Sequence, residues 1–153
     1  MIPLYDGDDA LKLDNQFCFV LYALSRKIIA QYRPLLDQLG LTYPQYLVML
    51  VLWEALPDPE RPQGVTLKFI GERLMLDSGT LTPLLKRLEG NGLLHRERAK
   101  HDEREVLIRL SLDGIQLKER TRHVPLQVLC SSAVAPEKLI ELKDELRLLL
   151  DES

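Results

Sequence analysis

Apolar residues recur at helical spacing in two short stretches near the middle of the chain. Residues 67–74 place apolar side chains on one helical face, and leucines repeat in the same way through residues 78–90. Asp77 lies in the turn between them, where its carboxylate can cap the second helix. Gly90 or Gly92 would end that helix. Two short helices joined by a tight turn are typical of the helix-turn-helix, whose second helix enters the major groove of DNA.

A short strand at Thr66 precedes these helices, and two strands of alternating polar and apolar residues follow them. The later strands span residues 93–99 and 104–110, and the charged tip KHDE between them contains no glycine. A two-residue hairpin turn is therefore not expected. A charged ribbon after a helix-turn-helix is the arrangement of a winged helix, whose wing would lie along the DNA backbone or in the minor groove. The alternative is a small α+β core without a DNA-binding role, but the order, lengths and polarity of the elements favour the winged helix.

The polar face of the second predicted helix carries residue types that contact DNA. Lys86 and Arg87 suit phosphates, because a positive charge attracts the DNA backbone whatever its sequence. Hydroxyl side chains near the start of the helix suit base edges. These hydroxyl residues are Ser78, Thr80 and Thr82. On the wing, Arg104 is the best candidate for insertion into the groove.

Amphipathic helices are predicted on both sides of this region. They span residues 11–39, 43–55, 112–129 and 137–150. Thr42 and Gln45 form a capping box before the second of these helices. Pro34 is expected to kink the first helix or begin a new segment, and Pro125 to interrupt the third.

The predicted fold is mainly α with a small β wing (α+β), in a single domain of residues 1–153. In this arrangement residues 64–110 form the winged helix-turn-helix, and residues 11–56 and 111–153 form dimerisation helices. The flanking helices carry more apolar surface than one small winged helix can cover. We therefore expect them to pack against the same elements of a second chain.

The net charge of −3 argues against a protein that binds nucleic acid with its whole surface, but the charges are unevenly distributed. Residues 61–110 hold 10 Lys and Arg against 7 Asp and Glu, whereas the rest of the chain holds 10 against 16. A basic region within an acidic chain is typical of a protein that reads DNA with one part only.

No secretory signal is expected, because residues 1–10 carry acids where such a signal would be basic, and they are expected to form a loose arm. The longest apolar run, residues 46–53, is too short to span a bilayer. We therefore expect a cytoplasmic protein that does not contact a membrane. Residues 57–64 are rich in proline and are expected to be a connector.

Two cysteines, Cys18 and Cys130, are the candidates for redox chemistry. In the reducing cytosol they are expected to be reactive or inert thiols rather than a permanent disulfide. Burial as a small apolar residue is the commonest fate of a free cysteine. The sequence places no Lys or Arg within one helical turn of Cys18 to activate it. The histidines, His95, His101 and His123, lack partners at metal-ligand spacing, so neither a metal site nor a cofactor is expected.

Tyrosines are the candidate hydrogen-bond donors to Cys18. Tyr22 lies four residues further on and can reach it from the same chain. Tyr32 lies fourteen residues along the same predicted helix, a distance of roughly 21 Å. A contact between Tyr32 and Cys18 would therefore need the other subunit. The alternative is that these tyrosines simply pack in the core.

Four segments resemble, in the same order, segments of the MarR family of transcriptional regulators. They are DNQFCFVLYALSR (14–26), LTYPQYLVMLVLWE (41–54), LDSGTLTPLLKRLE (76–89) and DEREVLIRL (102–110). Within that family, residues 11–130 are similar to the organic-hydroperoxide repressors. The resemblance implies a dimeric winged-helix repressor that leaves its operator when an N-terminal cysteine is oxidised. Asp102 and Arg104 match the tip of its wing.

The same resemblance implies roles for the cysteines and two tyrosines. Cys18 matches the sensing cysteine, and Tyr32 and Tyr43 match tyrosines that hydrogen-bond it. Cys130 is similar in position to the second cysteine of the two-cysteine members. In those members an intersubunit disulfide, here between Cys18 and Cys130, resolves the sulfenic acid.

These observations predict a homodimeric repressor that is not an enzyme. Its partners would be a pseudo-palindromic, double-stranded DNA operator and an organic hydroperoxide as inducer. One alternative is a repressor of the same fold that a phenolic or other small ligand releases reversibly. A thiol peroxidase is a second alternative, which the DNA-binding region and the lack of a cation near Cys18 disfavour.

Overall fold

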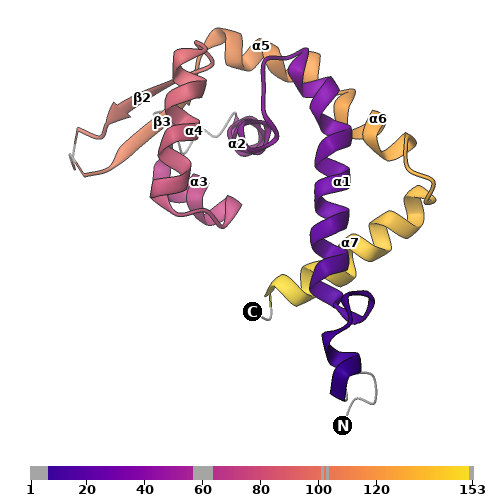
Figure 1. The fold of residues 1–153 in the computed structure, drawn as a ribbon. Coiled ribbons are helices and arrows are strands. Elements are labelled where there is room, and N and C mark those ends of the chain that lie inside the picture. The colour runs from indigo at the N-terminus through magenta and orange to yellow at the C-terminus, as the bar shows by residue number, and fades with distance from the viewer. Residues whose placement is uncertain (1–6, 57–63, 101, 103, 152–153) are drawn as a thin grey trace.

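A computed structural model describes residues 7–56, 64–100, 102 and 104–151, which form a mainly helical fold with a small sheet (Figure 1). The 3-10 turns η1 (Gly7–Leu11) and η2 (Leu13–Asn15) come first. The helices are α1 (Phe17–Asp37), α2 (Tyr43–Glu54), α3 (Leu67–Leu74), α4 (Ser78–Gly90), α5 (Leu112–Thr121), α6 (Val124–Cys130) and α7 (Pro136–Asp151). The strands are β1 (Val65–Thr66), β2 (Leu94–Arg98) and β3 (Val106–Leu110). The predicted fold class is confirmed.

Three predictions fall wholly or partly outside the described residues. The loose arm at residues 1–10 is described only from residue 7, and the connector at residues 57–64 only at its last residue. His101, one of the histidines considered as metal ligands, is also outside the described part of the chain.

The sheet is antiparallel, with β3 between β1 and β2. Val65 of β1 pairs with Ile108, and Leu94 of β2 pairs with Leu110. Residues 99–105 connect β2 to β3, and the backbone N–H of Ala99 donates to the carbonyl oxygen of Glu105 across their base at 2.9 Å. The prediction that this hairpin has no two-residue turn is therefore confirmed.

The helix-turn-helix forms where the sequence predicted it. Thr66 caps α3 by accepting the backbone N–H of Phe69 at 3.0 Å, and Asp77 caps α4 by accepting that of Thr80 at 2.8 Å. Between the helices the backbone passes very close to Gly71, where an added Cβ would lie 2.8 Å from the carbonyl oxygen of Leu76. A glycine at this position therefore allows the tight turn.

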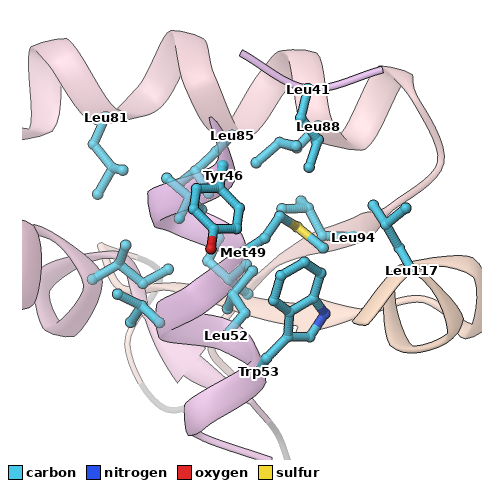
Figure 2. Packing of buried hydrophobic residues seen from close by; sticks show 14 of the residues in the cluster. Leu41, Tyr46, Met49, Leu52, Trp53, Leu81, Leu85, Leu88, Leu94 and Leu117 are labelled. Atoms are coloured by element: carbon cyan, nitrogen blue, oxygen red, sulfur yellow. The ribbon is translucent and has the colours of Figure 1, made fainter. Parts of the chain in front are cut away.

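The core of the molecule is built around α2, which packs against α3, α4 and α5. Figure 2 shows Tyr46, Met49 and Trp53 of α2 among leucines that α4 and β2 contribute. The capping box at Thr42 and Gln45 begins this helix, as predicted. At its other end the indole Nε1–H of Trp53 donates to the carbonyl oxygen of Gly114 at 2.8 Å, which joins α2 to α5.

The first long helix begins later than predicted, at Phe17 rather than Leu11. The residues before it form two 3-10 turns because polar side chains bond the local backbone. Asn15 donates to the carbonyl oxygen of Asp9 at 2.8 Å, and Gln16 donates to that of Ala10 at 2.6 Å. No new segment begins at Pro34, because α1 continues through it to Asp37.

The C-terminal part of the chain follows the predicted order. Ser111 caps α5, which ends at Thr121, and α6 begins with Pro125 in its first turn. Helix α1 contacts α2 and α6 (Figure 1). Helix α7 buries none of its residues. Among the described residues, no helix is both long enough and apolar enough to cross a bilayer.

Candidate DNA-binding face and thiol site

Helix α4 presents its polar side to solvent and its leucines to the core. Leu81, Leu85 and Leu88 are completely buried. The side chains of Lys86 and Arg87 are exposed, as are the predicted hydroxyl residues Ser78 and Thr80, whereas Thr82 is half-buried. The face predicted to contact DNA is thus free on the surface of this chain.

Two of the three predicted hydroxyl groups form hydrogen bonds that stabilise the first turn of α4. Thr80 Oγ1 donates to Asp77 Oδ2 at 3.0 Å, and Thr82 Oγ1 donates to the carbonyl oxygen of Ser78 at 2.7 Å. The hydrogen bonds from Thr80 hold the pKa of Asp77 below its usual value. Each hydroxyl has one hydrogen to donate, and both threonines already donate it at the start of α4. Towards the edge of a DNA base these hydroxyls can therefore act mainly as acceptors.

Ion pairs divide the basic residues of this region into two groups. Arg96 pairs with Glu89 at 2.6 Å, and Arg73 pairs with Glu54 at 2.6 Å. A second group has no ion pair to any residue that the structure describes. It comprises Lys86, Arg87, Arg98, Lys100 and Arg104. The charge available to phosphates therefore lies on α4 and on the wing.

Arg98 and Lys100 were not singled out from the sequence. Both lie on the wing near its tip, where the predicted candidates were Asp102 and Arg104. Nothing in their local pattern separates them from Arg96, because the packing of α4 against β2 decides which of these cations meets Glu89.

At the wing tip Asp102 organises the turn. Its carboxylate accepts the backbone N–H of Arg104 at 2.9 Å, and its carbonyl oxygen accepts that of Glu105 at 3.0 Å. The side chain of Arg104 is exposed. Asp102 therefore fixes the backbone of the turn from which the side chain of Arg104 extends into solvent.

The two cysteines are free thiols and both are exposed. Cys18 lies in the first turn of α1, and Cys130 is the last residue of α6. Nearby on α1, Tyr22 is 61% exposed, and the guanidinium carbon of Arg26 lies 5.4 Å from the centre of its ring. The contact predicted between Tyr22 and Cys18 stays a prediction.

Three tyrosines form a cluster where α1 meets α2. The ring centres of Tyr32 and Tyr43 are 5.0 Å apart, and Tyr46 lies 5.8 Å from Tyr32 and 6.2 Å from Tyr43. Tyr46 is only 3% exposed and was not predicted, although its spacing of three from Tyr43 places both on one helical face. Burial raises the pKa of Tyr32 and Tyr43, and raises that of Tyr46 to about 12. All three phenols therefore stay protonated near neutral pH.

The structure does not bring Cys18 to these tyrosines within one chain. Cys18 and Tyr32 lie on one continuous helix, fourteen residues and therefore roughly 21 Å apart. Within the described part of the chain, no three His, Cys, Asp or Glu residues are placed to hold a metal ion.

Comparison with known proteins identifies the family. The family model "Transcriptional regulator SarA/Rot" matches residues 30–121. The organic hydroperoxide resistance transcriptional regulator of Bacillus subtilis is 50% identical over 143 residues, covering 94% of this chain and 92% of that protein. The chain belongs to the MarR family of winged-helix transcriptional regulators. Its resemblance to the organic-hydroperoxide repressors of that family is thereby confirmed.

Solved structures of this family share the fold. Reduced AbfR bound to DNA superposes with a TM-score of 0.73 at 38% identity, covering 94% of this chain and 97% of that chain. AbfR is a protein of Staphylococcus epidermidis. Its disulfide form superposes with a TM-score of 0.61 over 94% of this chain and 96% of that chain. In this winged-helix fold α4 is the second helix of the helix-turn-helix, and the β2–β3 hairpin is the wing.

Proposed function

We propose that this chain is a transcriptional repressor that organic hydroperoxides inactivate through Cys18. The observation that carries the proposal is the 50% identity to the Bacillus subtilis regulator over 94% of this chain. The position of Cys18 supports it, because this thiol is exposed and lies in the first turn of α1. Free backbone N–H groups at a helix start stabilise negative charge, and the thiolate is the reactive form of cysteine.

The repressor would act as a homodimer that binds a pseudo-palindromic operator. Apolar side chains on the flanking helices remain exposed in the single chain and would meet their counterparts in a second copy. Two-fold symmetry would place two copies of α4 in successive major grooves, roughly 34–36 Å apart. It would also allow Tyr32 and Tyr43 of one subunit to reach Cys18 of the other.

The chemistry would proceed in two balanced steps. The Cys18 thiolate attacks the terminal oxygen of the hydroperoxide, the O–O bond breaks, and the peroxide leaves as an alcohol after taking up a proton. The resulting sulfenic acid is then attacked by the thiol of Cys130 from the other subunit, which forms a disulfide and releases water. The protonated tyrosines could donate hydrogen bonds to the oxygen that leaves in the first step.

The AbfR structures support a conformational role for the disulfide. That protein is known in a reduced form bound to DNA and in a disulfide form. The reduced, DNA-bound form superposes on this chain with a TM-score of 0.73 and the disulfide form with one of 0.61. Here, a disulfide between Cys18 and Cys130 would draw their Cα atoms to within about 4.4–6.8 Å and so move the DNA-binding parts of the dimer.

The test uses a duplex that the reduced native protein selects from random DNA, with cumene hydroperoxide as oxidant. We expect Cys18→Ser to bind this duplex normally and to stay bound after oxidation, because a hydroxyl does not replace the thiolate. Release of Cys18→Ser by the peroxide would contradict the proposal. Release of the native protein by a phenol after Cys18 has been alkylated would instead favour the reversible-ligand alternative.

Cys130→Ser separates the two chemical steps. We expect its Cys18 to oxidise, but its release from DNA to be less complete and its sulfur to pass on to sulfinic acid, because the resolving thiol is missing. A non-reducing gel and mass spectrometry measure both results. If the native protein shows no intersubunit disulfide after oxidation, Cys130 has no resolving role.

A further inference from the structure

The end of the recognition helix is tied to the wing by one half-buried ion pair. Glu89, in the last turn of α4, accepts the backbone N–H of Arg96 in β2 at 3.0 Å through Oε1. Its Oε2 accepts Nε–H and Nη2–H of the same arginine at 2.9 and 2.6 Å. The side chains of Glu89 and Arg96 are 34% and 25% exposed. These bonds hold the pKa of Glu89 below its usual value, so the pair stays charged at neutral and mildly acidic pH.

The turn between α4 and β2 adds to this connection. The backbone N–H groups of Gly92 and Leu93 donate to the carbonyl oxygens of Glu89 and Leu88 at 2.9 and 3.0 Å. Gly92 takes the left-handed conformation that this ending requires, with φ at 73°. Leu88 and Leu94 are completely buried on either side of the turn. The start of β2 is thus fixed by packing in the core. The Glu89–Arg96 pair fixes the strand two residues further on.

On its other side the wing is held by β1, which pairs with β3 at Val65–Ile108 and Thr66–Leu107, but this pairing does not reach α4. Arg109 pairs with Glu97, but both residues belong to the ribbon itself and therefore do not connect it to α4. Strand β2 lies at the edge of the sheet with β3 as its one strand neighbour, and a pair of strands is only marginally stable by itself. The angle between the wing and the recognition helix therefore depends on contacts at the base of the ribbon, where Glu89 and Arg96 meet.

We propose that Glu89 and Arg96 are positioning residues for DNA recognition, which set the angle at which the wing leaves the recognition helix. The angle matters because α4 and the wing contact different parts of the duplex, and both contacts must form together. Arg96 would not itself bind a phosphate, because its charge is neutralised and its Nε and Nη2 donors are occupied by Glu89. This role goes beyond the oxidation switch and does not depend on it.

The test compares reduced Glu89→Gln, Arg96→Gln and the double variant on two DNA probes. One is the duplex that the native chain selects from random DNA, and the other is the same duplex with its sequence shuffled. We expect each single variant to lose about tenfold in affinity for the selected duplex, as for the loss of one charge-assisted contact. Affinity for the shuffled duplex should change by no more than about twofold, and the salt dependence should be unchanged. The double variant should be no weaker than either single variant.

Arg96→Lys distinguishes positioning from a direct phosphate contact. It keeps the positive charge but loses the planar fork that binds Glu89, so the proposal expects the same loss of affinity as for Arg96→Gln. Glu97→Gln is the matched control, because it removes an ion pair within the wing and should leave affinity unchanged. Thermal unfolding of each variant checks that the protein is folded, and hydroxyl-radical footprinting should show weaker protection under the wing than under α4.

Other results would overturn the proposal. If Arg96 binds a phosphate, Arg96→Gln weakens both duplexes alike and lowers the salt slope by about one. In that case Arg96→Lys would bind nearly normally, and Glu89→Gln would bind more tightly because it frees the arginine. Unchanged affinity in all three single variants would show that the pair does not set the angle.

Discussion

The DNA-binding head and the flanking helices bury their apolar side chains to very different extents. We define the head as residues 43–110 and the flanking helices as α1, α5, α6 and α7. In the head, Leu81, Leu85 and Leu88 of α4 are completely buried. In α7, leucines and isoleucine repeat at similar spacing, yet none is buried, and α1 buries only Leu36, close to the point where the chain turns into α2.

An amphipathic pattern therefore shows which face of a helix must be buried, but it does not show which other element, or which other chain, buries that face. Within the head, α2, α3, α4 and the sheet bury one another's apolar faces, and α5 and α6 add Leu117 and Val124 to the same core. Helices α1 and α7 extend away from the head (Figure 1), and many of their large apolar side chains remain exposed. A single chain therefore completes the core of the head, whereas the flanking helices have the surface expected of a subunit interface.

The largest expected effect is on the stability of the head. Leu85→Ala would leave a cavity beneath α4 and should lower the free energy of unfolding by about 2–5 kcal/mol. Chemical denaturation measures this change. Lys86→Ala, on the exposed side of the same helix, is the control and should change stability by no more than about 0.5 kcal/mol. Equal stability of the two variants would contradict the central place of α4 in the core.

Charges on the flanking helices should break the dimer without unfolding the head. In α7, Ile140→Glu combined with Leu148→Glu would bury unpaired carboxylates in the proposed interface. We expect the dimer dissociation constant to rise at least about a hundredfold, or roughly 2.7 kcal/mol. Analytical ultracentrifugation measures it, with Lys143→Glu on the same helix as the control. A double variant that stays dimeric would exclude this face of α7 from the interface.

Removal of single charges from the head should weaken DNA binding more moderately. Lys86→Ala and Arg104→Ala should each lose roughly tenfold in affinity and reduce the salt slope by about one, if both residues contact phosphates or the minor groove. Titration of the selected duplex at several salt concentrations tests this. Lys143→Ala, far from the head in sequence, should bind normally. Unchanged affinity in both head variants would contradict the proposed docking.

The smallest expected effect lies where the head meets the flanking helices. Ser111 Oγ accepts the backbone N–H of Gly114 at 3.0 Å and donates to the carbonyl oxygen of Gly92 at 2.6 Å. Ser111→Ala should therefore cost about 1 kcal/mol of stability, as expected for the loss of a helix cap. Thermal unfolding measures the change, and Ser111→Thr should restore most of it because it keeps a capping hydroxyl. If alanine and threonine behave alike, the cap contributes no stability.

Most of the helix-turn-helix could be predicted from the sequence because its determinants are local. Thr66 and Asp77 cap helices a few residues away, and the leucines of α4 repeat within one helix. The start of α1 was predicted wrongly, because Asn15 and Gln16 bond backbone carbonyls six residues earlier. The apolar stripe of this helix begins at Phe17, and residues 11–16 before it contain no proline or glycine that would mark a boundary there.

By itself, the sequence determined the order of the elements, the caps that begin them and the face that each helix needs to bury. These features depend on backbone preferences and hydrogen bonds over a few residues, which act in the same way wherever the segment lies. Only the tertiary structure decided which tyrosines gather around Tyr32 and which cations stay unpaired. Arg96 and Arg98 look alike in the sequence, but the fold brings Glu89 to Arg96, while Arg98 finds no ion-pair partner among the described residues. Such pairings depend on the distance between segments after folding, and local residue pattern carries no measure of that distance.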